Sequence, residues 1–582
     1  MNNYFKPLKY TAVIIAGMIL PIYICFSYFF EKNYFSWAYY CFVSIFFGII
    51  LLFKTIPGKI KTINVNSIDL LLILYSSYII IYYFFVPNYA IISKHQIIFF
   101  TLPFYFLFGS GKMRNFDLLA KIISIVCLFE ILIALLQLLG MIKNINDYFQ
   151  IAGTLGNPNV FAELLALGVP MLLFLFKHES KKSNQLLILT VLLLSISFIF
   201  FVKARGAILG LLLFFTVISF RFLSRKKRII SILIFTLLTC LLFLIKHDSM
   251  TGRLLIWKVS LNAITTKPFL GFGINSFSQN YLRFQSAFLN TSTNEQFKWI
   301  AGEPEWAYNE LIEHAFEGGI PLALLWLGLL TAAFWPIIRN WRKTNNISDI
   351  QLALLGIFVV FTTISLVNFT FSVYPILLIF LIALSFVSHD LKPVWIINKK
   401  YLYLFLSIWL LVATIQFIGI CDYLPNSFKI RKIQNTRVID NDSDDYLRKL
   451  ADQYPLYGRL QMLCGAKAYQ RGEHTEAMKY LDRSIQTTQK SQAKLLKAKI
   501  LIDIQQYNKA EVLCKEVRNQ LPNRITPLYF LFLIAKAQDD ITCAIDLAHD
   551  IEHFQVKIKN RKTEKIKTEA KIFLYATKND NN

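Results

Sequence analysis

One long polar segment, residues 246–318, separates two apolar parts of this chain and decides how the fold is interpreted. It begins KHDSMTGRLLIWK (246–258), passes through TTKPFLGFGINSF (265–277) and ends EPEWAYNELIEHAFEGG (303–319). The sequence before it, and residues 320–421 after it, consist of closely spaced apolar runs joined by short loops. Placing charged groups at the edge of a membrane costs free energy, so each such group is a candidate for a functional role. We therefore expect the chemistry of the protein to lie in this segment.

The composition is that of a membrane protein. The chain has 582 residues, of which 55% are hydrophobic, and its mean hydropathy is +0.48. A soluble protein of this length is less apolar and divides into several cores. The net charge is +25, but many basic residues lie in short loops between apolar runs. This is the positive-inside pattern, so we expect membrane lipid and no nucleic acid as a partner.

The eight cysteines are scattered and show no CxxC pair or other metal-ligand spacing. We therefore expect neither a disulfide framework nor a zinc site.

Apolar runs of membrane-spanning length predict an all-α, polytopic bundle of about 12–13 spans. It would carry a large outer loop and a C-terminal helical-repeat domain. The predicted spans are residues 10–30, 37–53, 68–86, 96–109, 118–142, 160–176, 186–202, 207–220, 229–245, 320–338, 352–371, 373–388 and 401–421. The first has no small-residue cleavage site and precedes another span at once, so we interpret it as an uncleaved helix rather than a signal peptide.

The distribution of Lys and Arg predicts the orientation. With the N-terminus inside, the basic loops fall on the inner side, whereas the opposite short loops hold only Lys32, Lys94, Lys143, Lys203 and Arg205. This bias places the loop 246–318 and everything after the last span outside. The inner basic loops are residues 54–61, 112–114, 177–182, 221–228, 339–343 and 392–400.

From residue 422 the composition becomes that of a soluble helical domain, so the predicted domains are 1–421 and 422–582. Small residues recur about every 34 residues, at Ala477, Ala510 and Ala544, each after a turn-like stretch. This resembles tetratricopeptide repeats, which usually bind proteins or peptides. An unrelated helical bundle is the alternative.

Two arginines are candidates for binding an anionic ligand on the outer side. Arg205 ends the loop before the span 207–220, and Arg253 opens the polar segment. Guanidinium pairs phosphate oxygens bidentately and stays charged, so the pair suits a pyrophosphate. The alternative is that each arginine reaches lipid headgroups.

The segment GTLGNPN (153–159) precedes the span 160–176 on the same side and predicts a tight turn. Asn157 and Asn159 either hydrogen-bond sugar hydroxyls or cap the following helix. Glu163, one turn further on, is unusual for a lipid-facing position, so we expect it to face a cavity.

The order of several motifs resembles the O-antigen ligase family, which also includes O-antigen polymerases and bacterial protein O-oligosaccharyltransferases. The resemblance covers roughly residues 100–390 and rests on order and placement rather than on one motif. A tetratricopeptide-like tail resembles an appendage of some members. The motifs are GTLGNPNVFA (153–162), KARG (203–206), GRLLIW (252–257), KPFLGFGINSF (267–277), AYNE (307–310) and EGGI (317–320).

The resemblance implies a glycosyltransferase of the bacterial inner membrane, involved in lipopolysaccharide biosynthesis. It would take a glycan from a polyprenyl-pyrophosphate (undecaprenyl pyrophosphate) carrier and place it on an acceptor hydroxyl on the periplasmic side. Arg205 and Arg253 would hold the donor pyrophosphate. No metal or other cofactor is expected, because arginine replaces a metal in stabilising the leaving group. Partners would be the lipid-linked glycan, an acceptor glycolipid or protein, and proteins bound by the repeats.

One departure concerns the residue that accepts the acceptor's proton. Family members commonly have His-Asn where this chain has Tyr308-Asn309, and tyrosine is a poor base at neutral pH. If residues 307–317 are helical, Glu310, His314 and Glu317 share one face opposite an apolar one. Our hypothesis is that His314 or Glu310 takes the proton. The alternative is that this face is the solvated side of an amphipathic helix.

The sequence leaves the acceptor open. An O-antigen ligase would use a lipid A core sugar, a polymerase the growing glycan, and an oligosaccharyltransferase a protein Ser or Thr. We favour the ligase type. A transporter or flippase predicts charges along a path through the spans and internal repeats, neither of which is evident. A purely structural scaffold leaves the outer arginines without a role.

Overall fold

The protein is almost entirely helical in the computed structural model. The structure describes residues 34–55, 62–85, 96–109, 115–144, 146, 148–244, 247–435, 441–488, 490–557 and 559–580. In that part of the chain, the only strands are the four-residue β1 (Thr62–Val65) and β2 (Trp395–Asn398), which pair antiparallel. The predicted all-α class is therefore confirmed.

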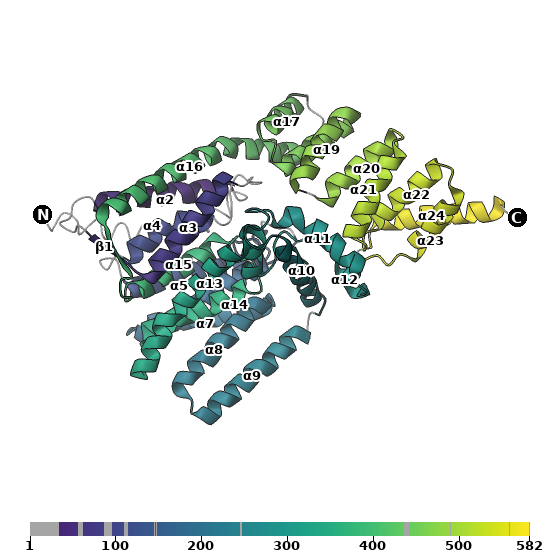
Figure 1. Cartoon of the computed structure of the whole chain (residues 1–582). Coiled ribbons are helices and arrows are strands. Elements are labelled where there is room, and N and C mark those ends of the chain that lie inside the picture. The colour runs from purple at the N-terminus through teal and green to yellow at the C-terminus, as the bar shows by residue number, and fades with distance from the viewer. Residues whose placement is uncertain are drawn as a thin grey trace.

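The apolar runs form a membrane bundle (Figure 1). Each predicted span from 37–53 onward falls on a helix, while the span 10–30 lies outside the described residues. Among the residues that the structure describes, five helices are long and apolar enough to cross a membrane: Phe116–Leu138, Pro158–His178, Lys182–Phe201, Glu310–Thr344 and Lys400–Asp422. The chain is a multi-pass membrane protein. The bundle consists of α2 (Tyr34–Thr55), α3 (Ser67–Phe85), α4 (Gln96–Gly109), α5 (Phe116–Leu138), α6 (Pro158–His178), α7 (Lys182–Phe201), α8 (Arg205–Phe222), α9 (Arg225–Leu244), α13 (Glu310–Thr344), α14 (Asp349–Ser365), α15 (Tyr374–Ser388) and α16 (Lys399–Asn435).

Several of the predicted inner loops meet at one end of the bundle. Asp349 forms ion pairs with Lys177 at 2.7 Å and with Arg221 at 3.2 Å, which joins the ends of α6, α8 and α14. The pairing of β1 with β2 joins the loop before α3 to the loop before α16. Loops that the charge bias assigns to the same side are thus close in space.

The segment 246–318, predicted as the large outer loop between two spans, consists largely of helices. It forms α10 (His247–Thr266), α11 (Phe277–Thr291), α12 (Glu295–Ile300) and the first turns of α13. Leu255, Val259 and Ala263 follow one face of α10 and join a small apolar core with α11, because residues four apart lie on the same helix face. We call residues 247–309 the outer subdomain. It lies between the bundle and the C-terminal helices (Figure 1).

Helix α13 bends where it passes from the outer subdomain into the bundle. Gly319 has φ 76°, which breaks the helical backbone. The loop 267–273 crosses at this point and uses the freed backbone groups: Phe272 N donates to Phe316 O at 2.9 Å, and Ile320 N donates to Pro268 O at 2.7 Å. The glycines of the GFG and EGG motifs therefore serve a close backbone crossing.

The C-terminal domain consists of α17 (Asn441–Gln453), α18 (Gly458–Gln470), α19 (His474–Thr488), α20 (Ser491–Asp503), α21 (Tyr507–Gln520), α22 (Ile525–Ala537), α23 (Ile541–His553) and α24 (Arg561–Asp580). Helices α18/α19, α20/α21 and α22/α23 are successive hairpins. Their spacing matches the period expected from the sequence, and Ala477, Ala510 and Ala544 are fully buried. The predicted boundary at residue 422 falls inside α16, which continues from the bundle to Asn435.

Candidate functional site

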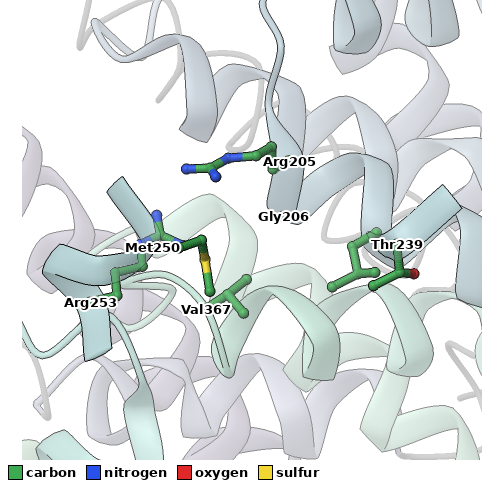
Figure 2. A pocket seen from close by; sticks show the side chains of 7 residues that line it. Arg205, Gly206, Thr239, Met250, Arg253 and Val367 are labelled. Atoms are coloured by element: carbon green, nitrogen blue, oxygen red, sulfur yellow. The ribbon is translucent and has the colours of Figure 1, made fainter. Parts of the chain in front are cut away.

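Arg205 and Arg253 line one pocket, as the sequence predicts. Arg205 begins α8 and Arg253 lies on α10, and both side chains line a cavity of about 40 Å³ (Figure 2). The two charges are near enough to repel each other. The remaining lining residues are mainly apolar: Gly206, Leu209, Thr239, Met250 and Val367. The pocket therefore offers two cations at one end of an apolar surface.

Arg253 rests on an aromatic residue. Its guanidinium carbon lies 5.2 Å from the centre of the Tyr308 ring, a cation–π geometry. Burial and the Arg205 charge lower the pKa of Arg253, but a guanidinium remains charged at neutral pH. Burial raises the pKa of Tyr308, although Arg253 acts in the opposite direction. The Tyr308 hydroxyl thus stays protonated at neutral pH.

A buried carboxylate lies behind the pocket. Glu163 on α6 is 2% exposed, and its Oε1 accepts a hydrogen bond from the side chain of Asn368. Its Oε2 has no hydrogen-bond partner among the described residues, and the carboxylate attracts Arg253. A Cβ at Gly206 would lie 3.9 Å from Oε1. Glu163 therefore faces the arginine pair from beneath the pocket wall and does not face lipid.

The turn 153–159 is held from below by α5. Gln137 accepts from the backbone N–H groups of Ala152 and Gly153, at 2.9 and 3.0 Å, and Glu130 accepts from Thr154 N at 2.9 Å. Asn157 caps α6 by accepting from Asn159 N at 2.9 Å. The capping alternative for Asn157 is thus what the structure shows, while the Asn159 side chain is exposed.

Helix α13 begins at Glu310, later than the expected start at residue 307. Asn309 is its N-cap and accepts from Ile312 N at 3.2 Å, and Tyr308 has φ 52°, outside helical geometry. Glu313 accepts from Ala307 N at 2.7 Å. A capping residue and a glutamate that reaches back to the preceding backbone together fix where the helix starts.

The Glu310–His314–Glu317 face is buried, so the alternative of a solvated face is wrong. Glu310 is 2%, His314 0% and Glu317 1% exposed. The reason is that the first turns of α13 lie between two apolar cores. Leu311 packs against the core of the bundle, whereas Phe316 packs into the apolar core of the outer subdomain. Residues 313–319 are all buried as a result, whereas Leu311 and Ile312 in the first turn are partly exposed.

His314 has both ring nitrogens engaged. Nδ1 lies 2.5 Å from the Glu310 carbonyl oxygen, which can only accept, so Nδ1 carries the proton. Nε2 then accepts from the Tyr75 hydroxyl at 2.9 Å. The ring also stacks on Trp326 and meets the edge of Phe371. Glu310 Oε1 accepts from Phe371 N at 2.9 Å.

Sequence reasoning missed the segment that joins these groups, residues 366–373. The predicted span 352–371 includes most of it, but α14 ends at Ser365. Val367 lines the pocket, Asn368 binds Glu163, and Thr370 donates to Glu310 at 3.3 Å. The signal in the sequence is the pair of polar residues, Asn368 and Thr370, that interrupts an apolar run near the predicted outer side.

Within the described residues, one group of side chains has metal-ligand spacing. It comprises His549, Glu552 and His553 on α23 of the C-terminal domain. It lies on a hairpin of the helical repeats and contributes nothing to the arginine pocket. The seven cysteines among the described residues of the whole chain are free thiols.

The fold and the pocket together define a class: a multi-pass membrane protein with a cationic, apolar-walled site under a helical outer subdomain. Residues 188–327 match the family model described as O-antigen ligase. The matched part of the chain contains Arg205, Arg253, Tyr308, Glu310 and His314. The match supports glycan transfer of the O-antigen ligase type in general. No curated protein matches the chain.

Proposed function

We propose that this protein transfers a glycan from a polyprenyl-pyrophosphate carrier to an acceptor hydroxyl at the outer face of the inner membrane. The observation that carries the proposal is the convergence of Arg205 and Arg253 on one apolar-walled pocket within the family match. A lipid-linked pyrophosphate has the same two parts, an anion and an apolar chain. With the orientation predicted from the distribution of Lys and Arg, the outer subdomain and the C-terminal domain are periplasmic.

The proposed reaction is a displacement at the anomeric carbon of the donor sugar. The acceptor oxygen forms a bond to this carbon while the bond from the carbon to the pyrophosphate oxygen breaks. The polyprenyl pyrophosphate leaves with an additional negative charge, which Arg205 and Arg253 stabilise. Arg253 is held in place by the ring of Tyr308.

The acceptor's proton goes to His314 or Glu310. His314 Nδ1 and Glu310 Oε2 lie 3.8 Å apart. The Nε2 lone pair of His314 already accepts from Tyr75, so a proton transfer to His314 requires that hydrogen bond to open or to relay the proton. Asn157 and Asn309 cap helices through their Oδ1 atoms, and their side-chain NH2 groups would donate hydrogen bonds to the glycan.

The arginine pair is tested with purified protein and a lipid-linked glycan. Replacement of Arg205 or Arg253 by alanine is expected to slow donor consumption by about a hundredfold or more, the range seen when a transition-state donor is lost. The matched control is Arg283→Ala, an exposed arginine on α11 of the same subdomain. Full activity in either pocket variant would contradict the proposed donor site.

The proton acceptor is tested by Glu310→Gln and His314→Gln in the same assay. Replacement of the residue that takes the proton should lower turnover by about a hundredfold or more, while the variant still binds the donor. If neither substitution lowers turnover, the hypothesis that one of them is the base is wrong.

The acceptor is identified by deleting the gene and separating surface polysaccharide on a gel. Loss of all long-chain material together with accumulated lipid-linked glycan indicates a ligase, the type that we favour. A single repeat unit on the core indicates a polymerase. Unchanged polysaccharide with under-glycosylated proteins indicates an oligosaccharyltransferase.

A further inference from the structure

The C-terminal domain contacts the outer subdomain at helices α11 and α12 and at one irregular segment, residues 301–309. This segment links α12 to α13 and has no regular secondary structure. Its first half lies against the C-terminal domain, and its second half lies against the arginine pocket. We call it the linking segment.

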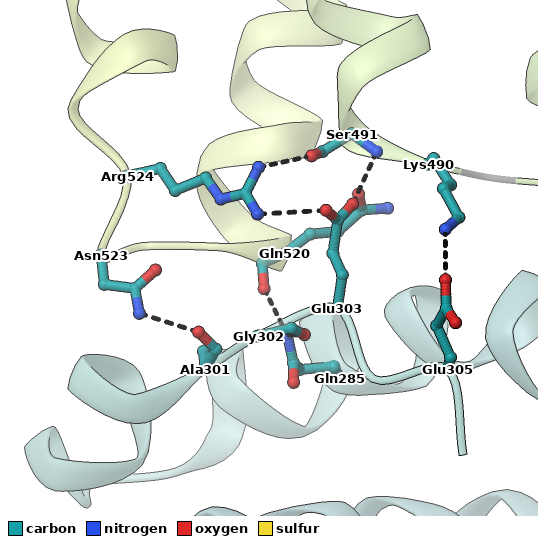
Figure 3. A network of polar contacts seen from close by, with 10 residues as sticks. All are labelled: Gln285, Ala301, Gly302, Glu303, Glu305, Lys490, Ser491, Gln520, Asn523 and Arg524. Atoms are coloured by element: carbon teal, nitrogen blue, oxygen red, sulfur yellow. Dashed lines mark hydrogen bonds and ion pairs between the residues drawn. The ribbon is translucent and has the colours of Figure 1, made fainter. Parts of the chain in front are cut away.

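Two carboxylates fix the first half of the linking segment (Figure 3). Glu303 accepts from Ser491 N at 2.8 Å and pairs with Arg524 at 3.1 Å. Glu305 pairs with Arg459 at 2.6 Å and with Lys490 at 3.3 Å.

These partners occupy equivalent places in the three hairpins. Arg459 is in the first turn of α18, Lys490 and Ser491 begin α20, and Arg524 immediately precedes α22. A carboxylate near the start of a helix also interacts favourably with the helix dipole. One edge of the repeat array is therefore matched to the two acidic side chains of the linking segment.

Backbone groups are bound at the same place. The side chain of Asn523 donates to Trp299 O at 2.7 Å and to Ala301 O at 2.8 Å. Gln285 on α11 donates to Gly302 O and, from the same nitrogen, to Gln520 O at 2.7 Å. Leu521, fully buried, belongs to the apolar core of the outer subdomain. The contact is thus apolar, ionic and hydrogen-bonded at once, unlike an isolated surface ion pair.

The second half of the linking segment reaches the pocket within three residues. The Trp306 ring stacks on Phe369 with centroids 4.2 Å apart. Ala307 is held on both sides, because Trp257 donates to its carbonyl at 2.9 Å and its N–H donates to Glu313. Tyr308 then lies under the guanidinium of Arg253.

We propose that the C-terminal domain is a positioning element of the donor site. Glu303 and Glu305 hold the linking segment, and the linking segment holds Tyr308 beneath Arg253. This proposal goes beyond the proposed function, because it makes turnover of the lipid-linked donor depend on a domain that contacts neither the donor nor Arg205 and Arg253. Glu303 and Glu305 are accordingly positioning residues.

The test is a charge exchange in the full-length protein in lipid nanodiscs. Glu303→Arg and Arg524→Glu, singly, should each lower donor turnover by roughly tenfold, since small displacements of a site cost this much or more. The double variant Glu303→Arg/Arg524→Glu should recover most of the turnover, because the ion pair is restored with reversed sense. Glu305→Arg with Arg459→Glu gives an independent second pair.

The control is Arg483→Glu, which breaks an ion pair with Asp452 inside the C-terminal domain and should leave turnover unchanged. Hydrogen exchange of residues 301–309 is measured on the same samples. It should rise in the single variants and return to the original rate in the double variant. This readout does not depend on activity.

Increased exchange with unchanged turnover in the single variants would overturn the proposal, as would equal loss of turnover in the Arg483→Glu control. Failure of the proposed function looks different. In that case the unmodified protein does not consume the lipid-linked donor, while hydrogen exchange of the linking segment still responds to the charge exchange.

Discussion

At the scale of single residues, the pocket depends on a tyrosine in an unusual place. The resemblance described above leads one to expect a histidine, and hence a base, at the position of Tyr308. The structure shows its ring under Arg253, with a left-handed backbone at φ 52°. We therefore propose that this residue contributes a ring face that orients the Arg253 cation, and that its hydroxyl takes no part in the reaction.

Tyr308→Phe should retain most of the donor turnover, because the ring stays and the hydroxyl is protonated at neutral pH. Tyr308→Ala should lose about tenfold, since a desolvated cation–π contact contributes up to about 2 kcal/mol. Initial rates of donor consumption at neutral pH measure both. Loss of activity in Tyr308→Phe would show that the hydroxyl takes part in the reaction.

At the scale of elements, the kink in α13 joins the membrane bundle to the outer subdomain. The backbone of residues 268–273 crosses α13 so closely that a Cβ at Gly319 would overlap the carbonyl oxygen of Phe269. The positive φ of Gly319 adds strain for any other residue. This crossing fixes how the pocket residue Arg253 is placed relative to the bundle.

Gly319→Ala should lower the apparent thermal midpoint of the purified protein, because the strain alone costs about 1–3 kcal/mol. Gly252→Ala is the matched control. A Cβ at Gly252 meets no atom within 4 Å, and alanine is the better helix former by about 1 kcal/mol. The control should therefore leave the midpoint unchanged or raise it. A Gly319→Ala protein as stable as the control would disprove the close crossing.

The elements that sequence predicted well are those with a local signal. The apolar runs gave the bundle helices, because a span must satisfy its backbone internally. The polar segment 246–318 was predicted only as an outer loop between spans. The helical spacing of Leu255, Val259 and Ala263 was not recognised, because polar and charged residues lie between them. The predicted span 352–371 wrongly included residues 366–371, because most of these residues are apolar and the polar residues Asn368 and Thr370 did not mark the end of the helix.

At the scale of the whole molecule, the site consists of contacts between residues far apart in sequence. Tyr75 meets His314 across 239 positions, and Asn368 meets Glu163 across 205. The arginine pair was predictable because both members lie on the same predicted side of the membrane. Their buried surroundings were not predictable, because no local period encodes which helices pack together.

The proposed orientation of the molecule predicts which thiols react from outside the cell. Cys543 on α23 is exposed, and Lys343, near the end of α13, is exposed on the predicted inner side. With the other cysteines replaced by serine, Cys543 should react with a membrane-impermeant maleimide in right-side-out membranes. A variant in which Cys543 is also replaced and Lys343→Cys is added should react only after permeabilisation. Reversed labelling of the pair would place the arginine pocket on the inner side and contradict the proposed orientation. Because the positive-inside bias acts on every short loop at once, this pair of thiols tests the orientation of the entire bundle.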